Sequence, residues 1–223
     1  MSVLLTKNLC FSYPGKEPLF RDIYIDVNEG EALAINGPSG CGKSTLLYCM
    51  CGIIPRTFKG KLTGDIFICG KHISDIPRYE MASLLGIVFQ NPECQLFCDT
   101  VEDEIAFGPE NLCFSKEEIG SRIDEALQIV GMERYRYTHP EKLSGGQKQL
   151  VAIASVLALR PRILLFDEVM SQIDSVGKEL VLDCINRLKR NGHTFVMVDH
   201  DASNLSAADR ILNLLPVGGV ENG

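Results

Sequence analysis

The stretch NGPSGCGKST, residues 36–45, ends in a lysine and two hydroxyl side chains after three closely spaced glycines. Gly37, Gly42, Lys43 and Ser44 fit the pattern G-x-x-x-x-G-K-[ST], in which successive backbone N–H groups turn inward around phosphate oxygens. The apolar stretch EALAING before the loop predicts a buried strand, and a helix is expected from near Lys43. That helix would direct its positive N-terminal end at the phosphates. The stretch therefore predicts a phosphate-binding loop rather than an ordinary turn.

Each part of this loop has an expected role toward a nucleoside triphosphate. Lys43 is expected to neutralise the β- and γ-phosphates, Ser44 to ligate Mg²⁺, and Thr45 to add a further hydroxyl. The positive field of the loop is also expected to favour the thiolate form of Cys41. The remaining loop residues would contact phosphate mainly through their backbone, and these are Gly37, Pro38, Ser39, Gly40, Cys41 and Gly42.

A second element, RILLFDE at residues 162–168, supplies two acids at the end of an apolar run. The run predicts a buried strand, and the carboxyl ends of parallel strands are where α/β sheets bind their ligands. Asp167 is then placed for the Mg²⁺ shell and Glu168 for polarising an attacking water. Taken alone, the same residues could be a strand that ends in two solvated acids. Together with the phosphate loop, they predict a site of triphosphate hydrolysis.

Composition limits the remaining possibilities. The chain has 223 residues, 45% of them hydrophobic, which is enough for one substantial core. A formal net charge of −7, without a basic block, disfavours a nucleic-acid partner. The opening MSVLLTKNLCFSYP is too short and too polar for a signal peptide, and no apolar run reaches the length of a membrane span, so we expect a cytoplasmic chain. The nine cysteines lack paired CxxC motifs and are expected to be reduced thiols.

The order of predicted elements indicates an α/β fold. Segments 3–5, 9–13 and 23–27 predict an N-terminal antiparallel β subdomain, and further strands are expected in GDIFICG, LLGIVFQNP, RILLFDE and HTFVMVDH. A helix is expected over SVGKELVLDCINRLKR. Between these, a Thr100 cap and a capping box from Ser115 to Glu118 predict amphipathic helices without strands. We therefore expect one domain over residues 1–223, with a core of about 1–90 and 146–223 and a helical subdomain of about 91–145.

The segment KLSGGQKQLVAIASVLALRP identifies the family that the chain resembles. Ser144 and Gln147 satisfy a capping-box pattern at the start of a long helix, which alone would indicate only a well-capped helix. About 20 residues before the acidic strand, however, the segment is similar to the signature motif of the ATP-binding cassette (ABC) family. The resemblance covers nearly the whole chain and implies a P-loop NTPase, RecA-like core that binds ATP and Mg²⁺.

The resemblance implies roles for further residues. Gln90 would contact Mg²⁺ and water, and His200 would contact the γ-phosphate. Asp174 would lie at a dimer interface. Tyr13 would stack on adenine, although an exposed turn tyrosine is the alternative interpretation. In the family, two cassettes pack head to tail, so that the signature of one closes over ATP held by the other; here the signature residues are Ser144, Gly145, Gly146 and Gln147.

The stretch QNPECQLFCDTVEDEIAFGPENL, residues 90–112, resembles energy-coupling factor transporter ATPases, including cobalt-importer ATP-binding subunits. This implies a peripheral subunit at the cytoplasmic face of the membrane. Its partners would be a second ABC protomer, either a copy or a paralogue, a transmembrane coupling subunit, and a small membrane protein that captures a vitamin or metal ion. The alternative for the stretch itself is a generic exposed loop and helix.

Two departures from the family pattern stand out. Val169-Met170 follows Glu168 where many relatives have Pro-Thr, which bears on the shape of the dimer loop. The sequence given also ends with ADRILNLLPVGGVENG, so pairing is expected to depend on ATP and the membrane partner rather than on an extended C-terminal region. Alternative functions are the motor of a conventional importer or exporter and a non-hydrolysing regulatory cassette. The presence of Lys43, Asp167, Glu168 and His200 argues against the regulatory cassette.

Overall fold

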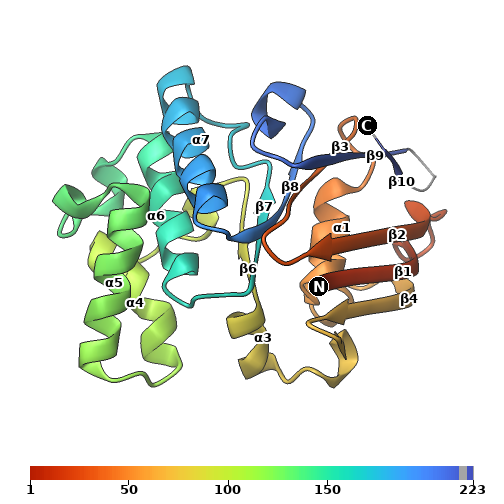
Figure 1. The fold of residues 1–223 in the computed structure, drawn as a ribbon, viewed down its shortest axis with the longest axis horizontal. Coiled ribbons are helices and arrows are strands. Elements are labelled where there is room, and N and C mark those ends of the chain that lie inside the picture. The colour runs from red at the N-terminus through yellow and green to blue at the C-terminus, as the bar shows by residue number, and fades with distance from the viewer. Residues whose placement is uncertain (216–219, 223) are drawn as a thin grey trace.

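Two sheets organise the chain in the computed structural model, which describes residues 1–215 and 220–222 (Figure 1). The first is antiparallel, with the order β2-β1-β4-β5. Its strands are β1 (Ser2–Ser12), β2 (Phe20–Asn28), β4 (Lys61–Ile68) and β5 (Lys71–His72). Segments 3–5 and 9–13, predicted as separate strands, are parts of the single strand β1, which ends one residue earlier, at Ser12, and has a register shift between Thr6 and Leu9. At this irregularity Asn8 adopts a φ of 49°.

The second sheet has six strands in the order β10-β9-β3-β8-β7-β6. All its pairings are parallel except that of β10 with β9. The strands are β3 (Ala32–Asn36), β6 (Leu85–Val88), β7 (Ile163–Asp167), β8 (Thr194–Asp199), β9 (Arg210–Leu214) and β10 (Val220–Asn222). Because Asn36 pairs with Asp199 and Asp167 with Val198, the carboxyl ends of β3, β7 and β8 meet at one edge. This edge receives the phosphate-loop sequence and both acids.

Helices pack on both faces of the second sheet, and α1 lies between it and the first sheet (Figure 1). The helices α4, α5, α6 and α7 gather on one side of the molecule, and the antiparallel sheet lies on the other. Two buried clusters result: one between the sheets and α1, and one beneath α4 to α7.

The α-helices are α1 (Lys43–Met50), α2 (Ile53–Arg56), α3 (Arg78–Leu84), α4 (Val101–Asn111), α5 (Lys116–Val130), α6 (Gly145–Leu157) and α7 (Ser175–Arg190). The 3₁₀ helices are η1 (Ile73–Asp75), η2 (Pro92–Cys94), η3 (Glu133–Tyr135), η4 (Pro140–Lys142) and η5 (Ala202–Leu205).

The helix caps agree with the sequence patterns at two of three positions. Thr100 accepts a hydrogen bond from the backbone N–H of Asp103, and a complete capping box opens α6 at Ser144. The predicted box at Ser115 is only half formed. Its hydroxyl accepts from the N–H of Glu118, but the Glu118 carboxylate accepts from the guanidinium of Arg122 instead of reaching back. The buried Arg122 therefore takes the carboxylate that the reciprocal half of the box requires.

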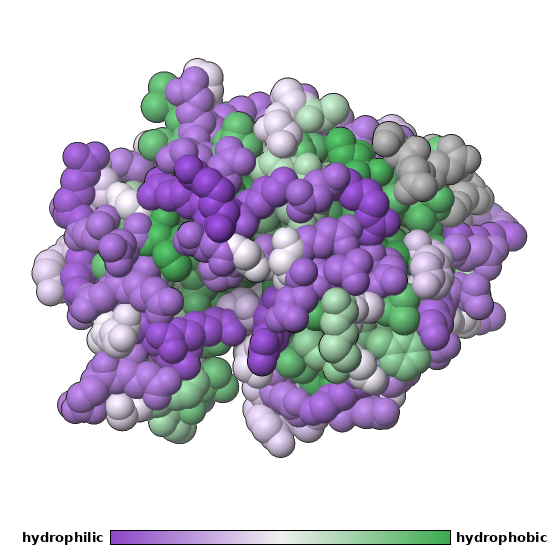
Figure 2. Space-filling model, viewed as in Figure 1, coloured by the Kyte–Doolittle hydropathy of each residue, from purple (hydrophilic) through white to green (hydrophobic). Residues whose placement is uncertain are grey.

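The surface differs in character between the two ends of the molecule. In the orientation of Figure 1, hydrophilic residues dominate the surface over α5, α6 and α7, and a patch of hydrophobic residues lies over the first sheet (Figure 2). Among the described residues, none of the helices combines the length and apolar character that crossing a bilayer requires.

The contact between β6 and α6 leaves no room for a side chain at Gly86. A Cβ added there would lie 2.3 Å from Val156 Cγ1 and 3.0 Å from Pro161 Cγ. We predict that Gly86→Ala lowers the free energy of unfolding by about 1–3 kcal/mol, because the strand must move away from the helix. Gly120→Ala is the matched control, since nothing lies within 4 Å of the added methyl in α5, and it should stabilise by roughly 0.5–1 kcal/mol. Urea denaturation that shows the same sign of change for both variants would contradict this packing.

Candidate functional site

The predicted phosphate loop connects β3 to α1, and its glycines are required by its shape. Gly40 and Gly42 adopt φ values of +81° and +105°, which side-chain-bearing residues rarely do. At Gly37 the backbone is crowded, since a Cβ would lie 2.8 Å from the carbonyl oxygen of Leu214 and 2.9 Å from Cys41 Sγ. The α1 helix then begins at Lys43 with its free N–H groups facing the loop. Such a curved backbone before a helix N-terminus fits a phosphate group.

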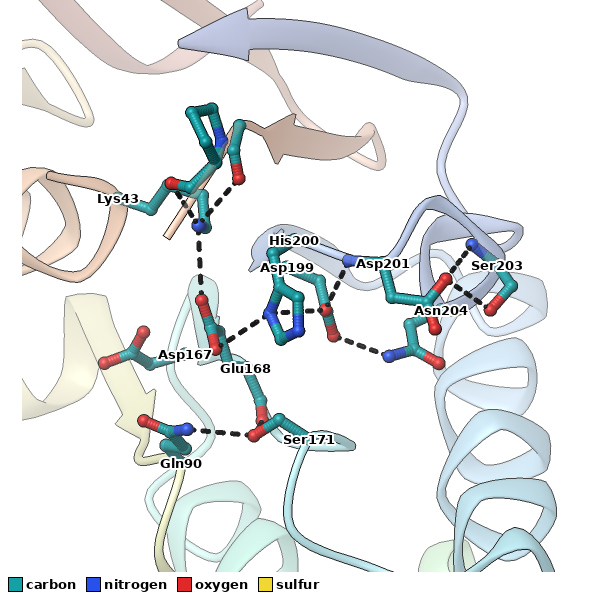
Figure 3. Close-up of polar contacts among 12 residues, drawn as sticks. Lys43, Gln90, Asp167, Glu168, Ser171, Asp199, His200, Asp201, Ser203 and Asn204 are labelled. Carbon is teal, nitrogen blue, oxygen red and sulfur yellow. Dashed lines mark hydrogen bonds and ion pairs between the residues drawn. The ribbon is translucent and has the colours of Figure 1, made fainter. Parts of the chain in front are cut away.

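Lys43 is almost fully buried, with 4% of its surface exposed. Its Nζ donates hydrogen bonds to the carbonyl oxygens of Gly37 (2.9 Å) and Pro38 (3.2 Å), so the side chain curls back beneath its own loop. It also forms an ion pair with Glu168, at 3.3 Å from Oε1 (Figure 3). A buried ammonium group at the centre of a glycine-rich loop is an anion-binding arrangement, which suits a polyphosphate.

Asp167 lies at the end of β7 and is 2% exposed. Its Oδ1 accepts a hydrogen bond of 2.6 Å from Ser44 Oγ, and its Oδ2 accepts one of 3.0 Å from Tyr48 OH. Burial raises the pKa of Asp167 despite these hydrogen bonds. Since a hydroxyl and a carboxylate are the hard oxygen ligands that Mg²⁺ prefers, Ser44 and Asp167 fit a magnesium site.

Tyr48 is a residue of the site that sequence reasoning missed. The available signal was its spacing, because Ser44 and Tyr48 are four residues apart and lie on the same face of α1. Burial, followed by the charge of Asp167, raises the pKa of Tyr48, so its hydroxyl keeps its proton and donates a hydrogen bond to the carboxylate.

Glu168 follows β7 directly, and its backbone adopts a left-handed conformation with φ of +46°. Its N–H donates to the carbonyl oxygen of Val198 on the neighbouring strand. As a result, the carboxylates of Asp167 and Glu168 point in different directions (Figure 3). Glu168 lies between two nitrogen groups, with Oε1 toward Lys43 and Oε2 at 3.2 Å from Nδ1 of His200. The unusual backbone thus separates the two predicted acid roles.

His200 is held near Glu168 by a polar cluster after β8. Its Nδ1 also lies 3.6 Å from Oδ1 of the buried Asp199. Asp199 in turn accepts hydrogen bonds of 2.9 Å from the N–H of Asp201 and from Nδ2 of Asn204 (Figure 3). The sequence pointed to His200 alone; the supporting roles of Asp199 and Asn204 depend on the turn that follows the strand.

Gln90 reaches the same region from the end of β6. Its Nε2 donates a hydrogen bond of 3.0 Å to Ser171 Oγ, and that hydroxyl donates one of 2.8 Å to the carbonyl oxygen of Glu168. Gln90 is therefore linked through Ser171 to the backbone of the acidic loop. The Val169-Met170 pair within this loop is buried in the core beneath the helices, which accounts for apolar residues at these positions.

Tyr13 lies beside the beginning of α1. Its hydroxyl is 3.0 Å from Thr45 Oγ1, and its ring packs edge-to-face on Phe11 with the centroids 4.9 Å apart. With 39% of its surface exposed, the ring remains accessible at the edge of the phosphate loop. The structure therefore brings Tyr13 next to Thr45, where a base attached to bound phosphates could reach it.

The expectation of a thiolate at Cys41 is wrong. Cys41 is 5% exposed, and burial raises the pKa of its thiol. The positive charge of Lys43 acts in the opposite direction but does not outweigh this burial. Cys41 is thus a neutral packing residue beneath the loop, and its sulfur fills the space beside Gly37. All nine cysteines are free thiols.

The signature residues form a separate group at the start of α6. Ser144 and Gln147 complete the capping box, and Gln147 Nε2 donates a hydrogen bond of 2.8 Å to Tyr135 OH. Gly146 packs on Gly177 of α7 so closely that an added Cβ would lie 2.4 Å from its Cα. Asp174 caps α7 by accepting from the N–H of Gly177. Among the described residues, no hydrogen bond or ion pair connects residues 144–147 to loop residues 37–45 of the same chain.

Comparisons with known proteins agree with this geometry. A sequence model of the ABC transporter family matches residues 20–171. An energy-coupling factor transporter ATP-binding protein, EcfA, from Methanosarcina acetivorans is 42% identical over 92% of this chain and 74% of its own length. The EcfA of Methanocaldococcus jannaschii is 39% identical over 90% of this chain and 71% of its own length. The chain spans only 33% and 37% of two other Methanosarcina relatives, which are provisionally named ABC transporter ATP-binding proteins.

Solved structures show the same similarity in three dimensions. CbiO1 from Clostridium perfringens, described as part of an ABC transporter complex, superimposes with a TM-score of 0.88 at 31% identity, covering 100% of this chain and 88% of CbiO1. A dimeric ATP-binding cassette in a post-hydrolysis state, bound to ADP and phosphate, gives a TM-score of 0.80 at 30% identity, covering 98% of this chain and 96% of that one. The predicted α/β fold, with its antiparallel and parallel sheets, is confirmed. The chain belongs to the ABC transporter family.

Proposed function

We propose that this chain is the ATP-binding and ATP-hydrolysing subunit of an energy-coupling factor importer. The observation that carries the proposal is that residues following three strand ends meet at the carboxylate of Glu168. Lys43 follows β3, Glu168 follows β7 and His200 follows β8, and Glu168 lies within 3.3 Å of both nitrogen groups. A regulatory cassette without hydrolysis would not need an acid held in this way between a phosphate-binding lysine and a histidine.

In the proposed reaction, the loop N–H groups and Lys43 hold the β- and γ-phosphates of ATP. Glu168 orients a water molecule and accepts its proton, and His200 holds the Glu168 carboxylate and contacts the γ-phosphate. Gln90, tied to the acidic loop through Ser171, contacts the water and the metal site. When bound at Ser44 and Asp167, Mg²⁺ screens the phosphate charge that opposes attack.

A complete site is proposed to need two chains. Ser144 and Gly145 are exposed, and the start of α6 has no bond to the phosphate loop of its own chain among the residues described. In a head-to-tail pair, this exposed N-terminus would face ATP on the partner, where its N–H groups can contact the γ-phosphate. The partner is either a second copy or a paralogue. ATP would then close the pair, and hydrolysis would open it.

The proposed membrane contact is the surface formed by residues 90–112 and the adjoining pocket. Phe97 and Phe107 are exposed and pack edge-to-face with the centroids 4.8 Å apart. The Phe97 and Cys98 N–H groups donate to the carboxylate of the buried Glu104, which fixes the aromatic pair at the surface. A nearby cavity of about 510 Å³ has mainly apolar walls, formed by Tyr48, Ile53, Thr57, Phe58, Phe89, Gln90, Asn91 and Cys94. Apolar anchors beside an apolar cavity suit a helix of a transmembrane subunit.

The importer type rests on the relatives named EcfA and on the residues 90–112. A substrate-capture membrane protein for a vitamin or metal ion would complete the transporter, at the cytoplasmic face of the membrane. The motor of a conventional ABC importer or exporter is the second candidate, because other relatives carry only the general ABC transporter name. Co-purification from the native membrane distinguishes the two transporter types, since only a subunit of the energy-coupling factor type would co-purify with a separate small capture protein.

Replacing the proposed base should trap the ATP-bound state. Glu168→Gln keeps the size of the side chain but removes the carboxylate, so turnover should fall by roughly 10²-fold or more while ATP still binds. A closed dimer should accumulate in size-exclusion chromatography with ATP and Mg²⁺. A Glu168→Gln chain that stays monomeric, even with its membrane partner, would contradict the proposed mechanism.

Adding Ser144→Arg to Glu168→Gln tests the composite site. A bulky cation at the exposed start of α6 should block closure over the partner's nucleotide, so the trapped dimer should disappear. Equilibrium binding of ATP to the monomer should remain, because Lys43 and its loop are unchanged. If Ser144→Arg abolishes monomer binding, the signature serves its own chain and the two-chain site is wrong.

Truncating an anchor should separate membrane coupling from nucleotide binding. Phe97→Ala should weaken assembly with the transmembrane subunit, measured by co-purification, while ATP affinity of the isolated chain stays unchanged. Tyr24→Ala removes an exposed aromatic from β2, in the first sheet and outside this surface, and is the control. Loss of ATP binding in Phe97→Ala would show a structural role instead. Charge reversal at Glu93 is a less selective probe, because Glu93 pairs at 2.7 Å with Lys148 of α6.

A further inference from the structure

The Asp167 carboxylate is held from both sides by one helix. Ser44 Oγ donates to Oδ1 at 2.6 Å, and Tyr48 OH donates to Oδ2 at 3.0 Å. Both donors lie on the same face of α1, one turn apart. With two donors on its two oxygens, the plane of the carboxylate is fixed relative to α1 and therefore to the phosphate loop that precedes it.

The tyrosine ring is itself held in place by aromatic contacts. It stacks on Phe58 with centroids 6.4 Å apart and an interplanar angle of 23°, and it meets Phe89 edge-on at 6.0 Å. The same ring forms part of the wall of the 510 Å³ cavity. Tyr48 thus has one end fixed among apolar rings and the other end, its hydroxyl, on a buried carboxylate. Since aromatic packing of this kind restricts the ring, the hydroxyl is presented to Asp167 at a defined position.

We propose that Tyr48 is a positioning residue for the metal-binding carboxylate of Asp167. This inference rests on the proposed Mg²⁺-dependent ATPase function, and it assigns to Tyr48 no contact with ATP or the metal. Ser44 is expected to bind the metal through its own oxygen, so it has a role beyond orientation. Tyr48 acts only through Asp167, by holding Oδ2 so that the other oxygen and the Ser44 hydroxyl face the ion together.

Removal of the Tyr48 hydroxyl leaves a specific defect. The Tyr48→Phe substitution keeps the aromatic ring and its contacts with Phe58 and Phe89, so the cavity and α1 are preserved. Oδ2 of a nearly inaccessible carboxylate then loses its partner, and the carboxylate is held by Ser44 alone, so its plane is less restricted. Such outer contacts typically account for a 10–100-fold factor in metal affinity, so roughly tenfold weaker metal binding is expected.

The test measures Mn²⁺ binding to the whole chain with a non-hydrolysable ATP analogue, by electron paramagnetic resonance. Tyr48→Phe should bind Mn²⁺ about tenfold more weakly than the wild type. Tyr24→Phe, at a tyrosine with 56% of its surface exposed, is the matched control and should leave Mn²⁺ affinity unchanged. Phe58→Ala removes the stacking partner but not the hydroxyl, and it should weaken Mn²⁺ binding in the same direction by a smaller factor.

Kinetics provide a readout that a merely structural role would not move. In Tyr48→Phe, the Mg²⁺ concentration for half-maximal ATPase activity should rise about tenfold, whereas kcat at saturating Mg²⁺ should stay close to the wild-type value. Equal Mn²⁺ affinity in Tyr48→Phe and the wild type overturns the inference. A wild-type chain that binds the analogue but no Mn²⁺ overturns the metal role of Asp167, and with it both this inference and the proposed magnesium dependence.

Discussion

The buried positive charge of Lys43 is the constraint on which the arrangement of the site depends. An ammonium group taken out of water needs hydrogen-bond acceptors and a negative partner, because isolated burial is very costly. Here two loop carbonyl oxygens and Glu168 supply them. The loop can curl over the ammonium group only because it has glycines where the backbone is left-handed, at Gly40 and Gly42, and where a side chain would not fit, at Gly37. Glu168 can reach it only because its own backbone leaves the β region at the end of β7. The buried charge of Lys43 therefore determines both the shape of the loop and the direction in which the Glu168 side chain points from the end of β7.

The patterns that the sequence predicted well are local ones. The phosphate loop, the strand ending at Asp167 and the capping box at Ser144 each depend on residues within a few positions of one another, so their chemistry is visible in the chain itself. The contacts that were missed depend on tertiary packing. Tyr48 meets Asp167 from a distant part of the chain. Arg122, which α6 holds through the carbonyl oxygen of Ala158, takes the carboxylate of Glu118 one turn before it. The thiol of Cys41 was misjudged for the same reason. Its pKa depends on how deeply tertiary packing buries it, and burial outweighs the nearby charge.

The signature helix and the proposed membrane surface are mechanically connected within one chain. Lys148 of α6 pairs with Glu93 at 2.7 Å, and Gln149 Nε2 donates a 3.1 Å hydrogen bond to the carbonyl oxygen of Phe89. Gln149 is fully buried, so this bond is shielded from water. Gln90, adjacent to Phe89, is in turn bonded to the acidic loop through Ser171. A displacement of the segment after β6 would therefore reach both the signature and the loop that carries Glu168, which is the coupling that a transport motor requires.

The buried ammonium group of Lys43 is expected to bind the phosphates of ATP. Titration calorimetry measures this as the ATP affinity of Lys43→Met, with Lys61→Met, at an exposed lysine of β4, as the control. Methionine keeps the length and packing of the side chain but removes the charge. Hydrogen bonds to charged groups contribute about 1.5–3 kcal/mol, so ATP should bind Lys43→Met at least about tenfold more weakly, while Lys61→Met binds it like the wild type. Wild-type ATP affinity in a folded Lys43→Met chain would show that Lys43 does not bind the phosphates.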